Sequence, residues 1–136
     1  MIRTSLVALS LLALAACSTT PIAVDQARAP TRVMAPELLQ AMPGTGTLVI
    51  LRDRGLSGSG CLHTVAIDGR PVTVLDNGEG VTFHLPAGRH LLNVDSGRGL
   101  CPNVAMSAEP DIVAGDRVVY RISLAADNAL RLTRTQ

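Results

Sequence analysis

The sequence of 136 residues contains no tryptophan, one phenylalanine (Phe83) and one tyrosine (Tyr120). Proteins that hold single-stranded nucleic acid use several aromatic side chains as stacking platforms, and many sugar sites stack their ligands in a similar way. Both aromatic residues here lie in apolar, strand-like contexts. Two such residues cannot build a stacking platform, so the composition argues against nucleic-acid binding.

Lysine is absent as well, and all twelve basic residues are arginine. Eleven acidic residues oppose them, which gives a formal net charge of +1. Loss of Arg3 with an N-terminal signal would bring this charge to zero. A balanced chain has no long-range field that would draw it to nucleic acid or to an acidic surface.

Residues 1–16 have the layout of a secretory signal peptide. Arg3 supplies the positive charge, and an apolar stretch follows from Leu6 to Ala16. This stretch is too short for a membrane-spanning helix, which needs about 20 apolar residues. The stretch ends in LAAC, which resembles the bacterial lipobox, where small residues precede a lipidated cysteine that becomes the new N-terminus. The alternative is an ordinary cleavage site followed by a chance cysteine.

The lipobox resemblance implies that Cys17 carries a diacylglyceryl group and an amide-linked acyl chain such as palmitate. Stable anchoring takes more than one chain, and this arrangement supplies it. In lipoproteins of this kind an aspartate after the cysteine implies retention at the inner membrane, and Ser18 stands there instead. We therefore expect an outer-membrane lipoprotein whose folded domain faces the periplasm or the cell surface.

Removing the first 16 of the 136 residues leaves 120, which is enough for one domain. Residues 17–43 hold the lipidated cysteine and four prolines among alanine, threonine and isolated charges. We predict that this segment is a flexible tether, with one short helical turn at Pro36. Residues 44–136 are predicted to form the folded domain.

From Gly44 onward, apolar residues alternate with polar ones between glycine-containing turns. Residues 61–67 place Cys61, His63, Val65 and Ile67 on one face. Residues 117–124 do the same with Val118, Tyr120 and Ile122. Residues 81–85 point Val81, Phe83 and Leu85 inward, and Asp68-Gly69 suits a tight hairpin turn. About eight short strands with this period predict an all-β, small antiparallel sandwich, with a small barrel as the alternative.

Residues 65–94 read VAIDGRPVTVLDNGEGVTFHLPAGRHLLNV. The Ile67-Asp68-Gly69 turn, the Gly78-Glu79 turn and the segment LPAGRHLLNV resemble the PEGA-type small β-sandwich domains of bacterial envelope lipoproteins. The resemblance covers about a quarter of the mature chain and implies a prealbumin-like fold. It also implies a non-enzymatic surface or periplasmic module whose partner is unknown.

Cys61 and Cys101 remain once Cys17 is lipidated. An even pair in an oxidising compartment predicts a disulfide, and two free buried thiols are the alternative. A zinc site would have to combine these cysteines with His63, His84 and His90. Strong zinc sites show two closely spaced ligand pairs, and only Cys61 and His63 are close here. We therefore predict no metal and no other cofactor, and we interpret His63 and His84 as partly exposed side chains and His90 as a residue near a strand end.

No catalytic motif is present. The stretch GLSGSGC, residues 55–61, does not fit the G-x-S-x-G pattern of a nucleophile elbow, which also needs a large α/β sheet. We therefore expect a protein that is not an enzyme. Two functions stay open: an interaction or structural module with an envelope protein or glycan partner, and an inhibitor or small-ligand carrier acting through its loops. A deep apolar pocket would favour carriage.

The two loops that run into the cysteines form a candidate anion-binding site. A Cys61–Cys101 disulfide would bring Arg52, Arg54 and Arg98 to one end of the sandwich, on glycine-rich backbone whose N–H groups can bind anions. The alternative is a pair of solvated loops, because Asp53 and Asp95 leave only one net positive charge there.

Overall fold

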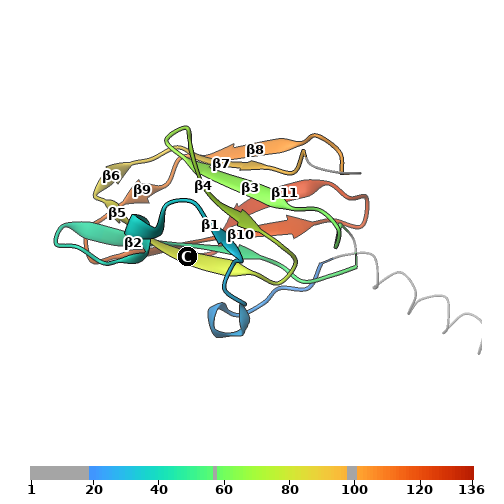
Figure 1. Ribbon diagram of the computed structural model, residues 1–136, viewed down its shortest axis with the longest axis horizontal. Coiled ribbons are helices and arrows are strands. Elements are labelled where there is room, and N and C mark those ends of the chain that lie inside the picture. Colours follow the sequence, from blue (N-terminus) through green and yellow to red (C-terminus); the bar gives the residue numbers. More distant parts are fainter. Residues whose placement is uncertain (1–18, 57, 98–100) are drawn as a thin grey trace, which may run out of the picture.

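The computed structural model describes residues 19–56, 58–97 and 101–136. Two β-sheets face each other and form a sandwich (Figure 1). The first sheet has the strand order β1-β4-β3-β7-β8 and the second has the order β11-β10-β2-β5, while β6 and β9 form a short separate pair. The strands are β1 (Arg32–Val33), β2 (Thr45–Arg52), β3 (His63–Ile67), β4 (Arg70–Leu75), β5 (Gly80–Pro86), β6 (Gly88–Arg89), β7 (Leu92–Asp95), β8 (Ala105–Ala108), β9 (Asp111–Ile112), β10 (Arg117–Leu124) and β11 (Leu130–Arg134).

This architecture confirms the prediction of an all-β sandwich. Eight of the described strands have four or more residues, and β1, β6 and β9 have two each. The alternation seen in the sequence sets the inward faces: Val81, Phe83 and Leu85 of β5 are all buried. Residues of β2, β3, β7 and β10 complete one continuous aliphatic core between the sheets.

One pair of neighbouring strands is parallel, which differs from the antiparallel pairing that we predicted throughout. Strand β2 runs parallel to β10 over residues 47–52 and 117–122, whereas the other described pairs of strands are antiparallel. Parallel neighbours need a long connection, and nearly the whole domain lies between these two strands. The two eight-residue strands, β2 and β10, therefore lie side by side in the middle of the second sheet.

The β3–β4 hairpin forms at the predicted turn. Asp68 and Gly69 both have positive φ values, 52° and 79°, as a two-residue type I′ turn requires. The Asp68 carboxylate also accepts hydrogen bonds from the Leu91 backbone N–H, at 2.8 Å, and from His90 Nδ1, at 2.7 Å. Burial alone lowers the pKa of His90, but its bonds to Asp68 and to the Pro86 carbonyl outweigh burial and raise this pKa.

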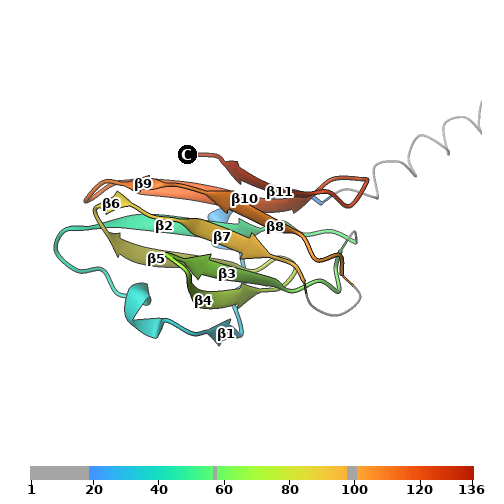
Figure 2. The same cartoon turned by 90° about the horizontal axis from the view of Figure 1, so that it is seen from above.

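The segment that we predicted as a flexible tether is instead packed against the sandwich from Thr19 onward. Thr20 forms an antiparallel bridge with Arg54, Arg28 forms a parallel bridge with Glu79, and β1 pairs with β4 at the edge of the first sheet (Figure 2). The 3₁₀ helix η2 (Val24–Gln26) lies between the two bridges, and a second 3₁₀ helix, η3 (Pro36–Leu39), follows β1. Within the described part of the chain, no helix is long and apolar enough to cross a membrane.

Apolar residues explain why this segment packs. Ile22 is 5% exposed and Ala35 is fully buried. Ala27 covers an apolar cluster on the outer face of the second sheet, which consists of Val49, Leu51 and Val119. Prolines withdraw N–H donors but still permit extended backbone at a sheet edge. The packed domain therefore includes residues 19–43, and the predicted boundary at residue 44 is wrong.

A candidate ligand pocket at the disulfide end

Cys61 and Cys101 form a disulfide with a Cα–Cα distance of 5.7 Å, which confirms the predicted pair. Cys61 lies just before β3, and Cys101 lies between β7 and β8 in the same sheet. The bond therefore closes the end of the first sheet at which β3 begins, and β2 of the second sheet ends at the same end of the sandwich. We call this the disulfide end of the sandwich.

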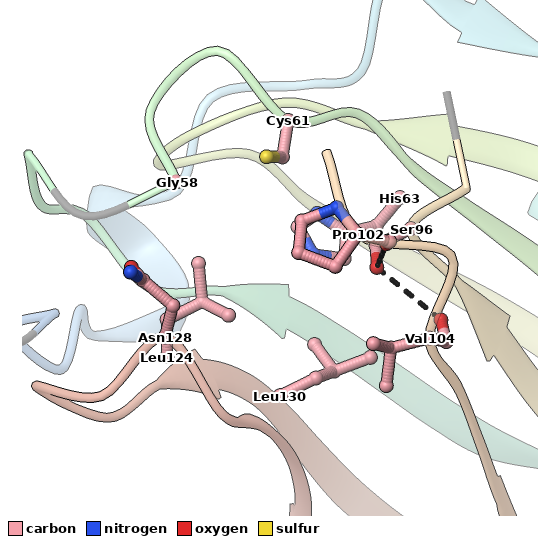
Figure 3. A pocket seen from close by; sticks show the side chains of 9 residues that line it. All are labelled: Gly58, Cys61, His63, Ser96, Pro102, Val104, Leu124, Asn128 and Leu130. Carbon is pink, nitrogen blue, oxygen red and sulfur yellow. Dashed lines mark hydrogen bonds between the residues drawn. The ribbon is translucent and has the colours of Figure 1, made fainter. Parts of the chain in front are cut away.

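A pocket of about 340 Å³ opens between the two sheets at the disulfide end (Figure 3). Its walls are mainly apolar, with Leu124 and Leu130 from the second sheet facing Val104. Gly58 lies on the rim with φ of 62°, and an ideal Cβ there would come within 2.1 Å of Leu124 Cδ1. A larger residue would therefore crowd the rim. The described lining residues are Gly58, Cys61, His63, Ser96, Pro102, Val104, Leu124, Asn128 and Leu130.

His63 is the ionisable residue among the described residues that line this pocket. Its side chain is fully buried, and neither ring nitrogen has a hydrogen-bond partner among the described residues. Burial, reinforced by the positive charge of Arg52, lowers its pKa from 6.5 to about 4. The charge of Asp76 and the Cys61 backbone carbonyl, which lies near the imidazole but does not meet the geometry of a hydrogen bond, oppose this shift more weakly. His63 is therefore neutral at neutral pH, with one N–H donor and one acceptor that no described residue uses.

We interpreted His63 from the sequence as a partly exposed side chain, and this interpretation is wrong. It occupies an inward position of β3, in phase with Val65 and Ile67, and the disulfide and the β10–β11 end cover it. The alternation along the strand did indicate that His63 is buried, because His63 lies on the same face as the aliphatic residues Val65 and Ile67. An unpaired polar group in the interior costs about 1–3 kcal/mol, so this position stands out energetically.

Arg52 is buried rather than displayed on a loop, which corrects the predicted anion-binding site. It is the last residue of β2, in phase with the inward-facing Leu48 and Ile50, and it is 0% exposed. Its guanidinium donates to the carbonyl of Asp53 at 2.6 Å and to that of Gly58 at 3.4 Å. Burial lowers its pKa, and the charges of Asp53 and Asp76 partly offset this effect. Arg52 thus belongs to the inward face of β2 and not to the loop that follows it.

Arg54, the other described arginine of that hypothesis, does not form a site with Arg52. Arg54 is exposed, and its guanidinium lies over the turn at Gly78, where an ideal Cβ would be 3.1 Å from Arg54 Nε. Arg98 lies outside the described residues, as does Cys17. The structure therefore places a positive charge beneath the pocket rather than on a surface loop.

The three histidines lie in different places. His63 is in the pocket, and His84 is partly buried on β5 beside Thr47 Oγ1, at 3.5 Å. His90 is bonded to Asp68 near the β3–β4 turn, and both Cys61 and Cys101 are used by the disulfide. Over residues 19–56, 58–97 and 101–136, no group of three or more histidine, cysteine, aspartate or glutamate residues is placed to hold a metal ion.

No family model matches this sequence, and neither do the curated proteins or the solved structures with which it was compared.

Proposed function

We propose that this protein is a lipid-anchored, non-catalytic module of the cell envelope that binds a small, mainly apolar ligand in the pocket at the disulfide end. The observation that carries the proposal is His63, a buried neutral imidazole in the wall of an apolar pocket, whose two ring nitrogens have no hydrogen-bond partner among the described residues. A ligand with a polar group at this point would satisfy it. The lipobox-like sequence before Cys17 supports the anchor.

The pocket favours binding over catalysis. Ser96 lies in the same pocket as His63 and invites comparison with a hydrolase pair. However, its hydroxyl donates to the carbonyls of Pro102, at 3.1 Å, and Val104, at 3.2 Å, so its proton is directed away from the imidazole. A histidine whose pKa is about 4 is also a weak general base at neutral pH.

The dimensions of the pocket limit the class of ligand. Its volume of about 340 Å³ is at the lower end of the range for small-molecule sites. If each non-hydrogen atom needs roughly the 30 Å³ of a water molecule, the pocket holds on the order of ten such atoms. The buried charge of Arg52 favours an electron-rich group near His63. These features fit a small phenol, amide or carboxylic acid with an apolar body.

The alternative is an interaction module whose loops contact an envelope protein or a glycan. Such a module needs no interior cavity, whereas a carrier does. The pocket with its unsatisfied imidazole is therefore the reason to place small-ligand carriage first.

A matched pair of probes tests the proposed binding. We expect p-cresol to bind about fivefold more tightly than toluene, because only p-cresol can hydrogen-bond to His63, and one such bond is worth about 1 kcal/mol. The His63→Leu variant should lose this preference, and His84→Leu, which changes a histidine outside the pocket, should keep it. Titration followed by NMR measures both affinities. Equal preference in the parent and His63→Leu proteins would contradict the proposal.

The anchor is tested separately. The Cys17→Ser variant should not incorporate radiolabelled palmitate and should be released from the membrane fraction, while Ser18→Ala should behave as the parent protein does. The sandwich should stay folded, because the hydrogen bonds that attach Thr19 and Thr20 to Leu124 and Arg54 do not involve the substituted side chain. Palmitate labelling that persists in Cys17→Ser would show that the lipobox interpretation is wrong.

A further inference from the structure

The start of the described chain is fixed to the disulfide end by hydrogen bonds. The Thr19 backbone N–H donates to the Leu124 carbonyl at 3.2 Å, and the Leu124 N–H donates to Thr19 Oγ1 at 3.0 Å. Thr20 and Arg54 exchange two further backbone bonds of 2.6 and 3.2 Å. Leu124 is itself a wall of the pocket. Thr19 therefore lies next to the pocket, beside the end of β10 in the second sheet.

A buried ion pair holds the next residues in place. The carboxylate of Asp53, which is 1% exposed, pairs with the guanidinium of Arg121 and accepts the Ile22 N–H at 3.3 Å. The same guanidinium donates to the Ile22 carbonyl at 3.0 Å. Asp53, which directly follows β2, therefore binds the backbone N–H of Ile22, and Arg121 of β10 binds its carbonyl. The segment from Thr19 to Ile22 is part of the packed domain.

The short reach from Cys17 to Thr19 limits where a lipid on Cys17 can sit. Two residues of fully extended chain span at most about 7 Å. Strand β2 has eight residues and leads from the opposite end to the disulfide end, a length of about 27 Å. Acyl chains on Cys17 would therefore enter the bilayer near the disulfide end, and the opposite end cannot be the point of attachment.

An exposed apolar side chain lies at the same end. Leu56 follows Arg54 by two residues and is 79% exposed. At the antiparallel Thr20–Arg54 bridge, the chain leading back towards Cys17 and the chain leading on to Leu56 run in the same direction. A single exposed leucine is common on protein surfaces. Next to a lipid anchor, however, it is in a position to enter the boundary between headgroups and acyl chains.

We infer that the disulfide end of the sandwich faces the lipid bilayer, with Leu56 inserted into its surface and the pocket opening towards it. The inference rests on the proposed lipid anchor and goes beyond it by fixing the orientation of the domain. Its partner is a lipid surface. The ligand of the pocket then belongs to molecules that partition into the membrane, which agrees with the apolar walls around His63.

The absence of tryptophan makes the orientation measurable, because a single introduced tryptophan is the only one in the protein. Leu56→Trp reports on the disulfide end. Met42→Trp is the matched control: Met42 is 64% exposed and lies just before β2, at the opposite end. Thr133→Trp reports on a sandwich lying flat, since Thr133 lines the outer face of the second sheet beside Thr19. All three replace residues that are largely exposed.

The mature, lipidated variants are reconstituted into phosphatidylcholine vesicles that contain brominated lipid, which quenches tryptophan at short range. We expect quenching of Leu56→Trp to exceed that of Met42→Trp by about threefold or more, as insertion of this end requires. Equal quenching of the two, stronger quenching of Met42→Trp, or strongest quenching of Thr133→Trp would each overturn the orientation. Urea unfolding of each variant checks that the fold is intact.

Mass spectrometry and flotation separate this inference from the proposed anchor. A protein that carries the lipid and floats with vesicles, but shows no difference between Leu56→Trp and Met42→Trp, overturns the orientation and leaves the anchor standing. A protein without lipid on Cys17 that does not float overturns the anchor, and the orientation falls with it.

Discussion

Replacing Cys61 and Cys101 together with alanine is expected to lower the free energy of unfolding by about 4 kcal/mol. The disulfide joins residues separated by 40 positions, and the entropy lost by the unfolded chain on closing such a loop gives this figure. Domains of this size have total stabilities of about 5–15 kcal/mol. With only one phenylalanine and one tyrosine to bury, this domain should depend heavily on the bond.

Urea unfolding of the mature protein, with and without a thiol reductant, measures this dependence. Reduction should shift the parent midpoint strongly and leave that of the double alanine variant unchanged, so the variant is its own control for side effects of the reductant. Thiol titration of the folded, non-reduced protein should detect neither Cys61 nor Cys101. Two reactive thiols, or a parent stability that does not respond to reductant, would contradict the prediction.

The strand faces and the hairpin turn could be predicted because each depends only on residues that are neighbours in the sequence. The alternation over residues 81–85 needs only the two-residue period of a strand, and one face must then be inside. Asp68-Gly69 needs only the backbone freedom that a type I′ turn demands. The disulfide followed from the pairing of two remaining cysteines in an oxidising compartment, without knowledge of the fold.

The features that were missed depend on contacts between distant segments. Proline-rich composition suggested a free tether, but Ile22 is buried by residues about thirty and one hundred positions away, including Asp53 and Arg121. The parallel pairing of β2 with β10 likewise joins the two ends of the domain. No local pattern encodes such neighbours, because the period of a strand defines its faces but not its partners.

The candidate pocket could be predicted only in part from the sequence. The inward position of His63 was visible in the alternation, and so was the phase that continues from Leu48 and Ile50 to Arg52. General preference places both residue types at the surface, and we followed that preference over the pattern. No pattern in the sequence could show that both nitrogens of His63 lack a partner among the described residues, because this depends on the position of the opposing sheet.

Acidification from pH 8 to pH 5 is expected to destabilise the domain through His63 by about 2 kcal/mol. Burial and the nearby charge of Arg52 lower the folded-state pKa of His63 to about 4, while in the unfolded chain it has its ordinary value of 6.5. At pH values between 4 and 6.5, His63 is mostly protonated in the unfolded chain and mostly neutral in the folded domain. The free energy of unfolding therefore falls as the pH drops below about 6.5, and the loss levels off below about pH 4.

Variants at two histidines isolate this contribution. Urea unfolding of His63→Leu should show no loss of stability over this range, and at pH 8 the variant should be at least as stable as the parent, because it removes an unpaired buried polar group. His90 acts in the opposite direction: bonds to Asp68 and Pro86 raise its pKa despite burial, so its protonation adds stability as the pH falls. His90→Gln should therefore steepen the loss on acidification. If the parent and His63→Leu lose stability equally between pH 8 and pH 5, the imidazole does not titrate as its surroundings imply.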